Sequence, residues 1–149
     1  MRGKEPNDAQ KPHLSLRTPA LNSPPSCEAE FVNLQLLGRC YLNNNQAYRA
    51  YHILKGTETA QSRYLFAMSC FQMDLLSEAE AVLLPAREPD AEVPEGAAGH
   101  YLLGLIYRYT SRNEKSVKHL RKALFIYLLF WPAYKELCTL GQCKEYICH

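Results

Sequence analysis

The sequence of 149 residues has no long apolar run and no excess of charge of either sign. Its longest strongly apolar run, residues 123–134, contains Pro132 and is far shorter than the roughly 20 residues that a membrane-spanning helix needs. Seventeen Lys and Arg side chains stand against fifteen Asp and Glu, a net charge of +2, which is too small to indicate binding to nucleic acid. The sequence therefore predicts no membrane span, and neither a membrane nor a nucleic-acid partner.

The amino terminus lacks the apolar stretch of a signal peptide, because prolines at 6, 12, 19, 24 and 25 follow its basic residues. We therefore expect an intracellular protein whose cysteines, at 27, 40, 70, 138, 143 and 148, are small buried thiols. Residues 1–27 hold five of the nine prolines and few apolar side chains, so they are predicted to be disordered. A folded region is predicted for 28–141 and an irregular tail for 142–149.

From Phe31 onward the sequence follows a helical pattern that repeats three times. Each copy places a small residue in a first helix and another small residue twelve positions later, in a second helix. The pairs are Gly38 and Ala50, Ala67 and Ala79, and Gly104 and Ser116. A small residue lets the facing helix approach closely, so these six positions are predicted to be packing contacts within helix pairs.

The spacing of the copies indicates the fold. Short polar turns such as 43–45 and 111–113 join the two helices of a pair, which makes each pair an antiparallel hairpin. The copies follow one another at intervals of 29 and 37 residues, near the period of about 34 of the tetratricopeptide repeat. After the third pair, Trp131-Pro132 begins a further helix that is cut short. The sequence predicts an all-α, tetratricopeptide-like solenoid of about three helical hairpins.

Two stretches carry a closer resemblance to a known family. They are NLQLLGRCYLNNNQAYRAYHILKGTETAQSRYLFAMSCFQMDLLSEAEAVLL and GAAGHYLLGLIYRYT. Over about residues 28–141 the chain resembles the amino-terminal tetratricopeptide region of the cell-division-cycle protein twenty-seven family, especially its plant form, HOBBIT. One departure is the apolar segment 126–130, where the family usually has Asp-Pro.

The resemblance implies a function and partners. The family is a scaffold subunit of the anaphase-promoting complex, a ubiquitin ligase of the cell cycle. We therefore expect a non-catalytic scaffold in the nucleus and cytoplasm that binds other subunits of that complex and a second copy of itself. The alternatives are a general tetratricopeptide adaptor and a truncated copy that no longer assembles in that complex.

In a tetratricopeptide solenoid the first helices of the pairs line the concave face. Placing the sequence on that pattern gives a groove that is predicted to bind protein and is largely apolar and aromatic. Its residues are Gln35, Arg39, Leu42, Tyr64, Met68, Phe71, Tyr101, Leu105 and Arg108. The Lys and Asn side chains with which chaperone-binding relatives hold a peptide carboxylate are absent from this set, so a carboxylate clamp is not expected.

Charge is unevenly distributed along the folded region. Residues 74–95 hold seven acids and one arginine, while residues 108–122 hold six basic residues and one glutamate. These patches are read either as solvated helix faces or as surfaces that steer association with another subunit.

No motif in the sequence indicates catalysis, a cofactor or a small-molecule substrate. The strongest chemical alternative is a zinc or redox site at the carboxyl terminus, formed by Cys138, Cys143, Cys148 and His149. Along a continuous helix, however, thiols spaced by five residues point about 140° apart and do not converge. We therefore predict no metal site there.

Overall fold

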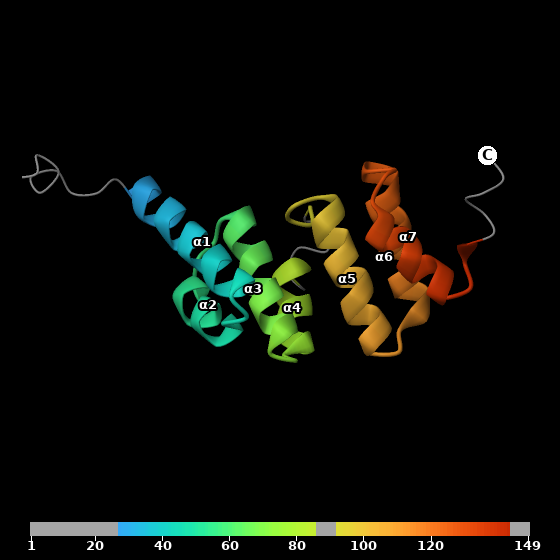
Figure 1. Ribbon diagram of the computed structural model, residues 1–149, viewed down its shortest axis with the longest axis horizontal. Coiled ribbons are helices and arrows are strands. Elements are labelled where there is room, and N and C mark those ends of the chain that lie inside the picture. Colours follow the sequence, from blue (N-terminus) through green and yellow to red (C-terminus); the bar gives the residue numbers. More distant parts are fainter. Residues whose placement is uncertain (1–26, 86–91, 144–149) are drawn as a thin grey trace, which may run out of the picture.

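Seven α-helices follow one another in the computed structural model, which describes residues 27–85 and 92–143. In chain order they are α1 (Cys27–Asn43), α2 (Ala47–Leu54), α3 (Ala60–Gln72), α4 (Leu76–Leu83), α5 (Ala97–Tyr109), α6 (Asn113–Ile126) and α7 (Trp131–Thr139). Figure 1 shows them in a row, with α1 at one end and α7 at the other. Those two ranges contain no strand, and the predicted all-α solenoid is confirmed.

The predicted tails fall almost entirely outside the described residues. Cys27, the last residue assigned to the amino-terminal tail, is already the first residue of α1. Of the carboxyl-terminal tail, only Gln142 and Cys143 are described. Among the described residues, no helix is both long and apolar enough to cross a bilayer.

The helices pack as three hairpins, which we call hairpin 1 (α1 and α2), hairpin 2 (α3 and α4) and hairpin 3 (α5 and α6), followed by α7. Buried apolar side chains form three clusters along the row. The first cluster is Leu42, Ala50, Leu54 and Leu65; the second includes Cys70, Leu83, Val93, Leu103 and Ile106; the third is Leu120, Ala123, Leu124, Ala133 and Leu137. The first two clusters each draw on two adjacent hairpins, so neighbouring hairpins share a core.

The small residues of the repeat lie where the two helices of a hairpin meet. A Cβ atom on Gly38 would lie 2.8 Å from Cδ1 of Leu54, and one on Gly104 would lie 2.7 Å from Cγ of Leu120. The residues at the other four positions, Ala50, Ala67, Ala79 and Ser116, are fully buried. In hairpin 3 the Ser116 hydroxyl also donates a 2.7 Å hydrogen bond to the Gly104 carbonyl. The absence of a side chain on the glycine therefore sets how closely α6 approaches α5.

The first helix of every hairpin, and α7, ends in the same turn. One residue takes a left-handed conformation, and the next N–H donates to the carbonyl five residues back, the closing bond of a Schellman turn. The left-handed residues are Asn45, Asp74, Ser111 and Gly141. The N–H of Gln142, for example, lies 2.9 Å from the Leu137 carbonyl. Because α7 has 9 residues where α3 and α5 have 13, this turn comes one helical turn early in α7.

Candidate protein-binding groove

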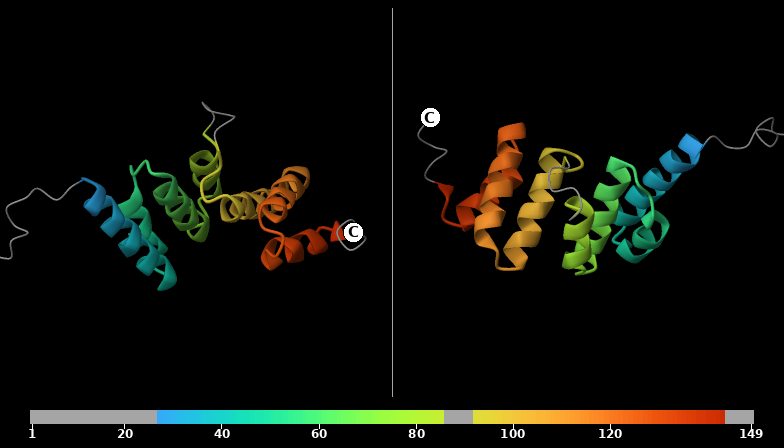
Figure 2. Two further views of the ribbon diagram at one scale, coloured as in Figure 1. Left: turned by 90° about the horizontal axis from the view of Figure 1, so that it is seen from above. Right: turned by 180° about the vertical axis from the view of Figure 1, so that it is seen from behind.

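The predicted groove residues come in threes from α1, α3 and α5, the first helices of the three hairpins. Helix α1 packs on α3, and α3 packs on α5, so the three sets are neighbours along the row of hairpins seen in Figure 2. Whether this surface binds a protein stays a prediction.

Tyr64 lies between the first two core clusters and packs against both. Burial raises the pKa of Tyr64 most, Glu95 raises it further, Arg39 on α1 lowers it, and Tyr101 on α5 adds a smaller increase. Burial also raises the pKa of Tyr101. Both phenols are therefore neutral at physiological pH and present aromatic rings with hydroxyl groups that can donate a hydrogen bond.

An aromatic pair continues the surface toward the ends of α3 and α5. The rings of Phe71 and Tyr109 have centroids 5.7 Å apart, and Tyr109 is 65% exposed. Met68 and Phe71 are half-buried against the shared core, which fixes their side chains. Tyr109 was missing from the predicted set, although it follows Leu105 by four residues and so lies on the same helix face.

Two polar side chains of the predicted set, Gln35 and Arg108, have partners within the chain. The Gln35 amide donates to the hydroxyl oxygens of Thr59, at 2.8 Å, and Ser62, at 3.0 Å, and so ties α1 to the start of α3. Arg108 forms an ion pair with Glu136 of α7. Their contacts therefore stabilise the array.

Helix α7 covers the far end of the surface. In addition to the Arg108–Glu136 ion pair, the rings of Tyr101 and Phe130 meet edge to face, with centroids 5.2 Å apart. Phe130 and Glu136 were not predicted as part of this surface, because the sequence alone gave no register between α7 and α5. The accessible part of the groove thus runs from Arg39 to Tyr109.

Leu42 does not line the groove, which corrects its prediction. Its side chain is only 6% exposed and belongs to the core with Ala50, Leu54 and Leu65. Phe71 and Arg108 occupy the equivalent positions of hairpins 2 and 3 and stay half-buried. Leu42 is covered instead because it packs into the core that α1 shares with α2 and α3.

The cysteines differ from the predicted set of buried thiols. Cys70 is buried, and burial raises the pKa of its thiol to about 12. Cys40, however, is exposed, because it lies two residues, or about 200° around α1, from Gly38 and the face that packs on α2. The prediction for Cys40 is therefore wrong.

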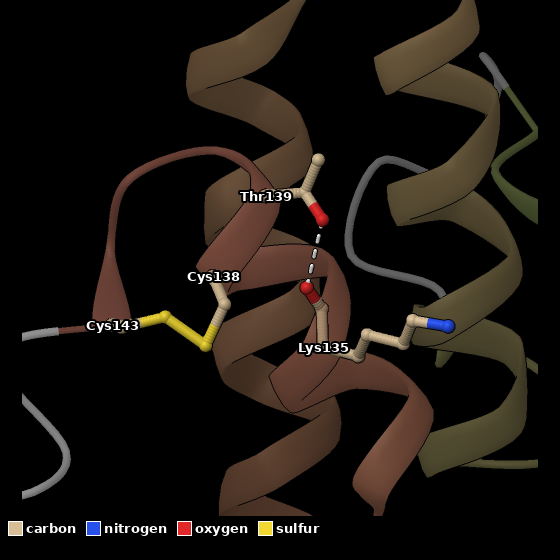
Figure 3. The surroundings of a disulfide bond; sticks show 4 residues. All are labelled: Lys135, Cys138, Thr139 and Cys143. Atoms are coloured by element: carbon tan, nitrogen blue, oxygen red, sulfur yellow. Dashed lines mark hydrogen bonds between the residues drawn. A yellow bond between two sulfur atoms is a disulfide. The ribbon is translucent and has the colours of Figure 1, made fainter.

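Cys138 and Cys143 form a disulfide at the end of α7 (Figure 3). The prediction that these thiols point apart assumed one continuous helix. The helix instead ends at Thr139, whose hydroxyl donates a 3.0 Å hydrogen bond to the Lys135 carbonyl. Gly141 then takes a left-handed conformation and turns the chain back. Cys148 and His149 lie outside the described residues. Within 27–85 and 92–143, no three His, Cys, Asp or Glu side chains gather as metal ligands.

Two histidines meet inside hairpin 3. Nδ1 of His100 on α5 lies 3.0 Å from Nδ1 of His119 on α6, and the rings are stacked. Burial lowers the pKa of both imidazoles. The pKa of His119 falls to about 4, because His100, Lys122 and Lys118 lower it further. Both rings are therefore neutral at pH 7 and join the two helices of the hairpin.

Comparison with known proteins identifies this repeat array. Residues 18–86 match the family model described as anaphase-promoting complex, cyclosome, subunit 3. Cell division cycle protein 27 homolog B of Arabidopsis thaliana is 63% identical over 120 residues, and homolog A is 64% identical over 114 residues. These alignments cover 78% and 76% of the present chain. The matched residues are a tetratricopeptide region of the cell division cycle protein 27 family.

The similarity extends beyond plants. The human cell division cycle protein 27 homolog is 32% identical over 120 residues, which cover 73% of this chain. The chain spans 16% of the length of each Arabidopsis relative and 15% of the human one. The resemblance seen in the sequence is thus confirmed for the repeat array, and the groove described above is built on repeats of the cell division cycle protein 27 family.

Proposed function

We propose that this chain is a non-catalytic scaffold piece of the anaphase-promoting complex and that the groove between Arg39 and Tyr109 binds another subunit. The observation that carries the proposal is the row of neutral aromatic and apolar side chains across hairpins 2 and 3, bordered by Arg39 of hairpin 1, in a region 63–64% identical to the Arabidopsis relatives. The names of the matched family model and relatives support the choice of complex.

The groove has the chemistry of an interface centre. Tyr64, Phe71 and Tyr101 are aromatic, held by packing and only partly exposed, and such residues supply most of the binding energy in many interfaces. Since Arg108 is engaged by Glu136, Arg39 is the exposed cation at one margin of the surface. We infer that the partner segment is apolar at its centre. A second copy of the chain is another occupant of the groove. We expect this binding to take place in the nucleus and cytoplasm.

The proposal is tested by affinity purification of the tagged chain from dividing cells, followed by identification of the recovered proteins. The test variant combines Leu105→Glu with Tyr109→Glu, which places two charges on the groove. Tyr48→Glu is the matched control, because Tyr48 is 64% exposed, like Tyr109 at 65%, but lies on the second helix of hairpin 1. Losing two contacts of the groove is expected to reduce recovery by at least about tenfold.

The wild-type chain and the Tyr48→Glu control are expected to recover subunits of the anaphase-promoting complex, and the groove variant to lose them while keeping its helical circular dichroism. Recovery of unrelated proteins alone would favour a general adaptor. Equal recovery by all three chains would place binding elsewhere and contradict the role assigned to the groove.

A further inference from the structure

Large apolar side chains are exposed side by side where α6 passes into α7. We call this segment the apolar corner. It consists of Phe125 (88% exposed), Ile126 (53%), Tyr127 (52%), Leu128 (81%), Leu129 (78%) and Trp131 (67%). A contiguous exposed apolar surface on a folded chain indicates a binding site for another molecule or for a membrane.

The apolar corner is the middle of the apolar run 123–134. A run of that length is too short to span a bilayer and is usually either a buried core helix or a segment that lies in a membrane interface. The middle of this run is not a buried core helix, because its side chains are exposed. Hydrogen bonds from the Phe130 and Trp131 N–H groups to the carbonyls of Tyr127 (3.1 Å) and Leu129 (2.8 Å) shape the corner as a turn whose side chains protrude.

Exposed lysines flank the apolar corner on both sides. Lys118, Lys122 and Phe125 lie within about 60° of one another around α6, so two ammonium groups lead along one helix face to the first apolar side chain. Lys135 is exposed one turn after Trp131 on α7. The exposed Glu95 brings one carboxylate to the same end of hairpin 3, beside Gly96, where an added Cβ would lie 3.9 Å from Ile126. Cations therefore predominate around the corner.

We propose that the apolar corner inserts into the interface of an anionic lipid bilayer, with Lys118, Lys122 and Lys135 at the headgroups. Trp and Tyr rings favour that interface, and an apolar anchor combined with a basic rim supplies the two signals that peripheral binding needs. The site lies outside the groove and does not depend on the proposed scaffold function. The sequence prediction of no membrane partner rested on the lack of a spanning helix, which leaves surface contact open.

The charges and the shape favour a bilayer over other occupants. A symmetric contact between two copies would bring the same lysines face to face, which costs binding free energy. The side chains of the corner also protrude, and a fluid interface accepts protruding side chains without a complementary groove. An anionic surface therefore matches both properties of the corner.

The chain carries its own reporter for this contact, because Trp131 is its only tryptophan. The purified chain is titrated with vesicles of phosphatidylcholine containing about 30% phosphatidylserine, and in parallel with pure phosphatidylcholine vesicles. We expect a blue shift of Trp131 emission and co-sedimentation with the anionic vesicles only. Raising the salt concentration is expected to weaken binding, since screening reduces the attraction of the lysines.

Two variants separate the apolar and the electrostatic parts. Leu128→Glu with Leu129→Glu is expected to weaken vesicle binding by more than about 100-fold, because two exposed anchors are replaced by charges. Lys118→Gln with Lys122→Gln is expected to weaken it by about 30-fold. Tyr48→Glu, at an exposed aromatic of hairpin 1 outside both the groove and the corner, is the control and should bind like the wild type.

The result that overturns the proposal is an unshifted Trp131 emission with anionic vesicles, or equal binding to both kinds of vesicle. A blue shift that depends on protein concentration without lipid, together with a larger mass by light scattering, would assign the corner to a second copy and also overturn it. Circular dichroism of each variant establishes that a loss of binding is not a loss of fold.

Discussion

The two links that join neighbouring hairpins are held in place by different interactions. Hairpin 1 continues into hairpin 2 through residues 55–59, and hairpin 2 into hairpin 3 through residues 84–96. In the short link, the Thr57 hydroxyl donates to the Leu54 carbonyl at 2.6 Å. The Thr59 hydroxyl caps α3 by accepting from the Ser62 N–H, and Gln35 donates to both Thr59 and Ser62. Short neutral hydrogen bonds fix this junction.

The long link depends on contacts between distant residues instead. Val93 returns the chain to the shared core, and Gly99 allows this because a Cβ there would overlap the Pro94 carbonyl. Arg112, after α5, forms two hydrogen bonds to Glu80 of α4, at 3.0 and 2.5 Å. Its guanidinium also lies 4.6 Å from the centroid of the Tyr107 ring.

The second junction therefore depends on charge, and the first does not. Hydrogen bonding from Arg112 lowers the pKa of the Glu80 carboxyl, which favours its ionised form. Burial, followed by the neighbouring Glu80 carboxylate, raises the pKa of Tyr107 to about 12. Hairpin 3 is therefore expected to respond to pH and salt more than hairpin 1.

Acid should destabilise hairpin 3 most. The pKa of His119 is about 4 in the folded chain, against about 6.5 when unfolded, so between these values the unfolded chain binds a proton that the folded chain excludes. The free energy of unfolding is therefore unaffected by this group above pH 6.5. It falls by about 3 kcal/mol because of His119 as the pH drops to 4. Denaturant titrations at pH 7 and pH 4 measure the loss.

His119→Gln is the matched variant, because it keeps a polar side chain that does not titrate. Between pH 7 and pH 4 its free energy of unfolding should fall by about 3 kcal/mol less than that of the wild type. Hydrogen exchange at pH 4.5 should place the added opening in 97–126 and spare 27–54; uniform opening of all hairpins would contradict the asymmetry.

A methyl group on the packing glycines should also distinguish the hairpins. At Gly104 the added Cβ meets Cγ of Leu120, the branch point of that side chain, and Ser116 already holds α6 to the glycine carbonyl. We expect Gly104→Ala to lower the free energy of unfolding by about 1–3 kcal/mol.

At Gly38 the nearest atom is a terminal methyl of Leu54, which can rotate away. The higher helix propensity of alanine, about 1 kcal/mol over glycine, also offsets the crowding. Gly38→Ala should therefore change the free energy of unfolding by less than about 1 kcal/mol, and equal losses at the two glycines in urea titrations would refute the difference.

Removing the charge at the second junction should have the smallest effect. The side chains of Arg112 and Glu80 are 37% and 26% exposed, so water screens the pair and Glu80→Gln should cost only about 0.5–1 kcal/mol. The cost should shrink at high salt. Glu92→Gln, at an exposed glutamate outside the helices, should cost nothing measurable under either condition. A salt-independent loss in Glu80→Gln would show that the pair does not act through charge.

The repeat pattern predicted the hairpins because small residues recur at a fixed spacing wherever two helices meet closely. The same pattern could not tell which side of α1 has a neighbour, so Cys40 was assigned to the interior and Leu42 to the groove. The disulfide of Cys138 was missed for a local reason, since α7 ends early and Gly141 turns the chain back, which brings Cys143 to Cys138 at the end of the helix. Tyr109 is different, because its spacing from Leu105 was readable in the sequence.

The two imidazoles of hairpin 3 cannot place their protons independently. A neutral ring carries one N–H, and a hydrogen bond between the Nδ1 atoms of His100 and His119 needs a proton on one and a lone pair on the other. One ring must therefore be the Nδ1–H tautomer and the other the Nε2–H tautomer. Exchanging these roles requires both rings to change tautomer together, so the folded hairpin has two proton arrangements on one and the same backbone.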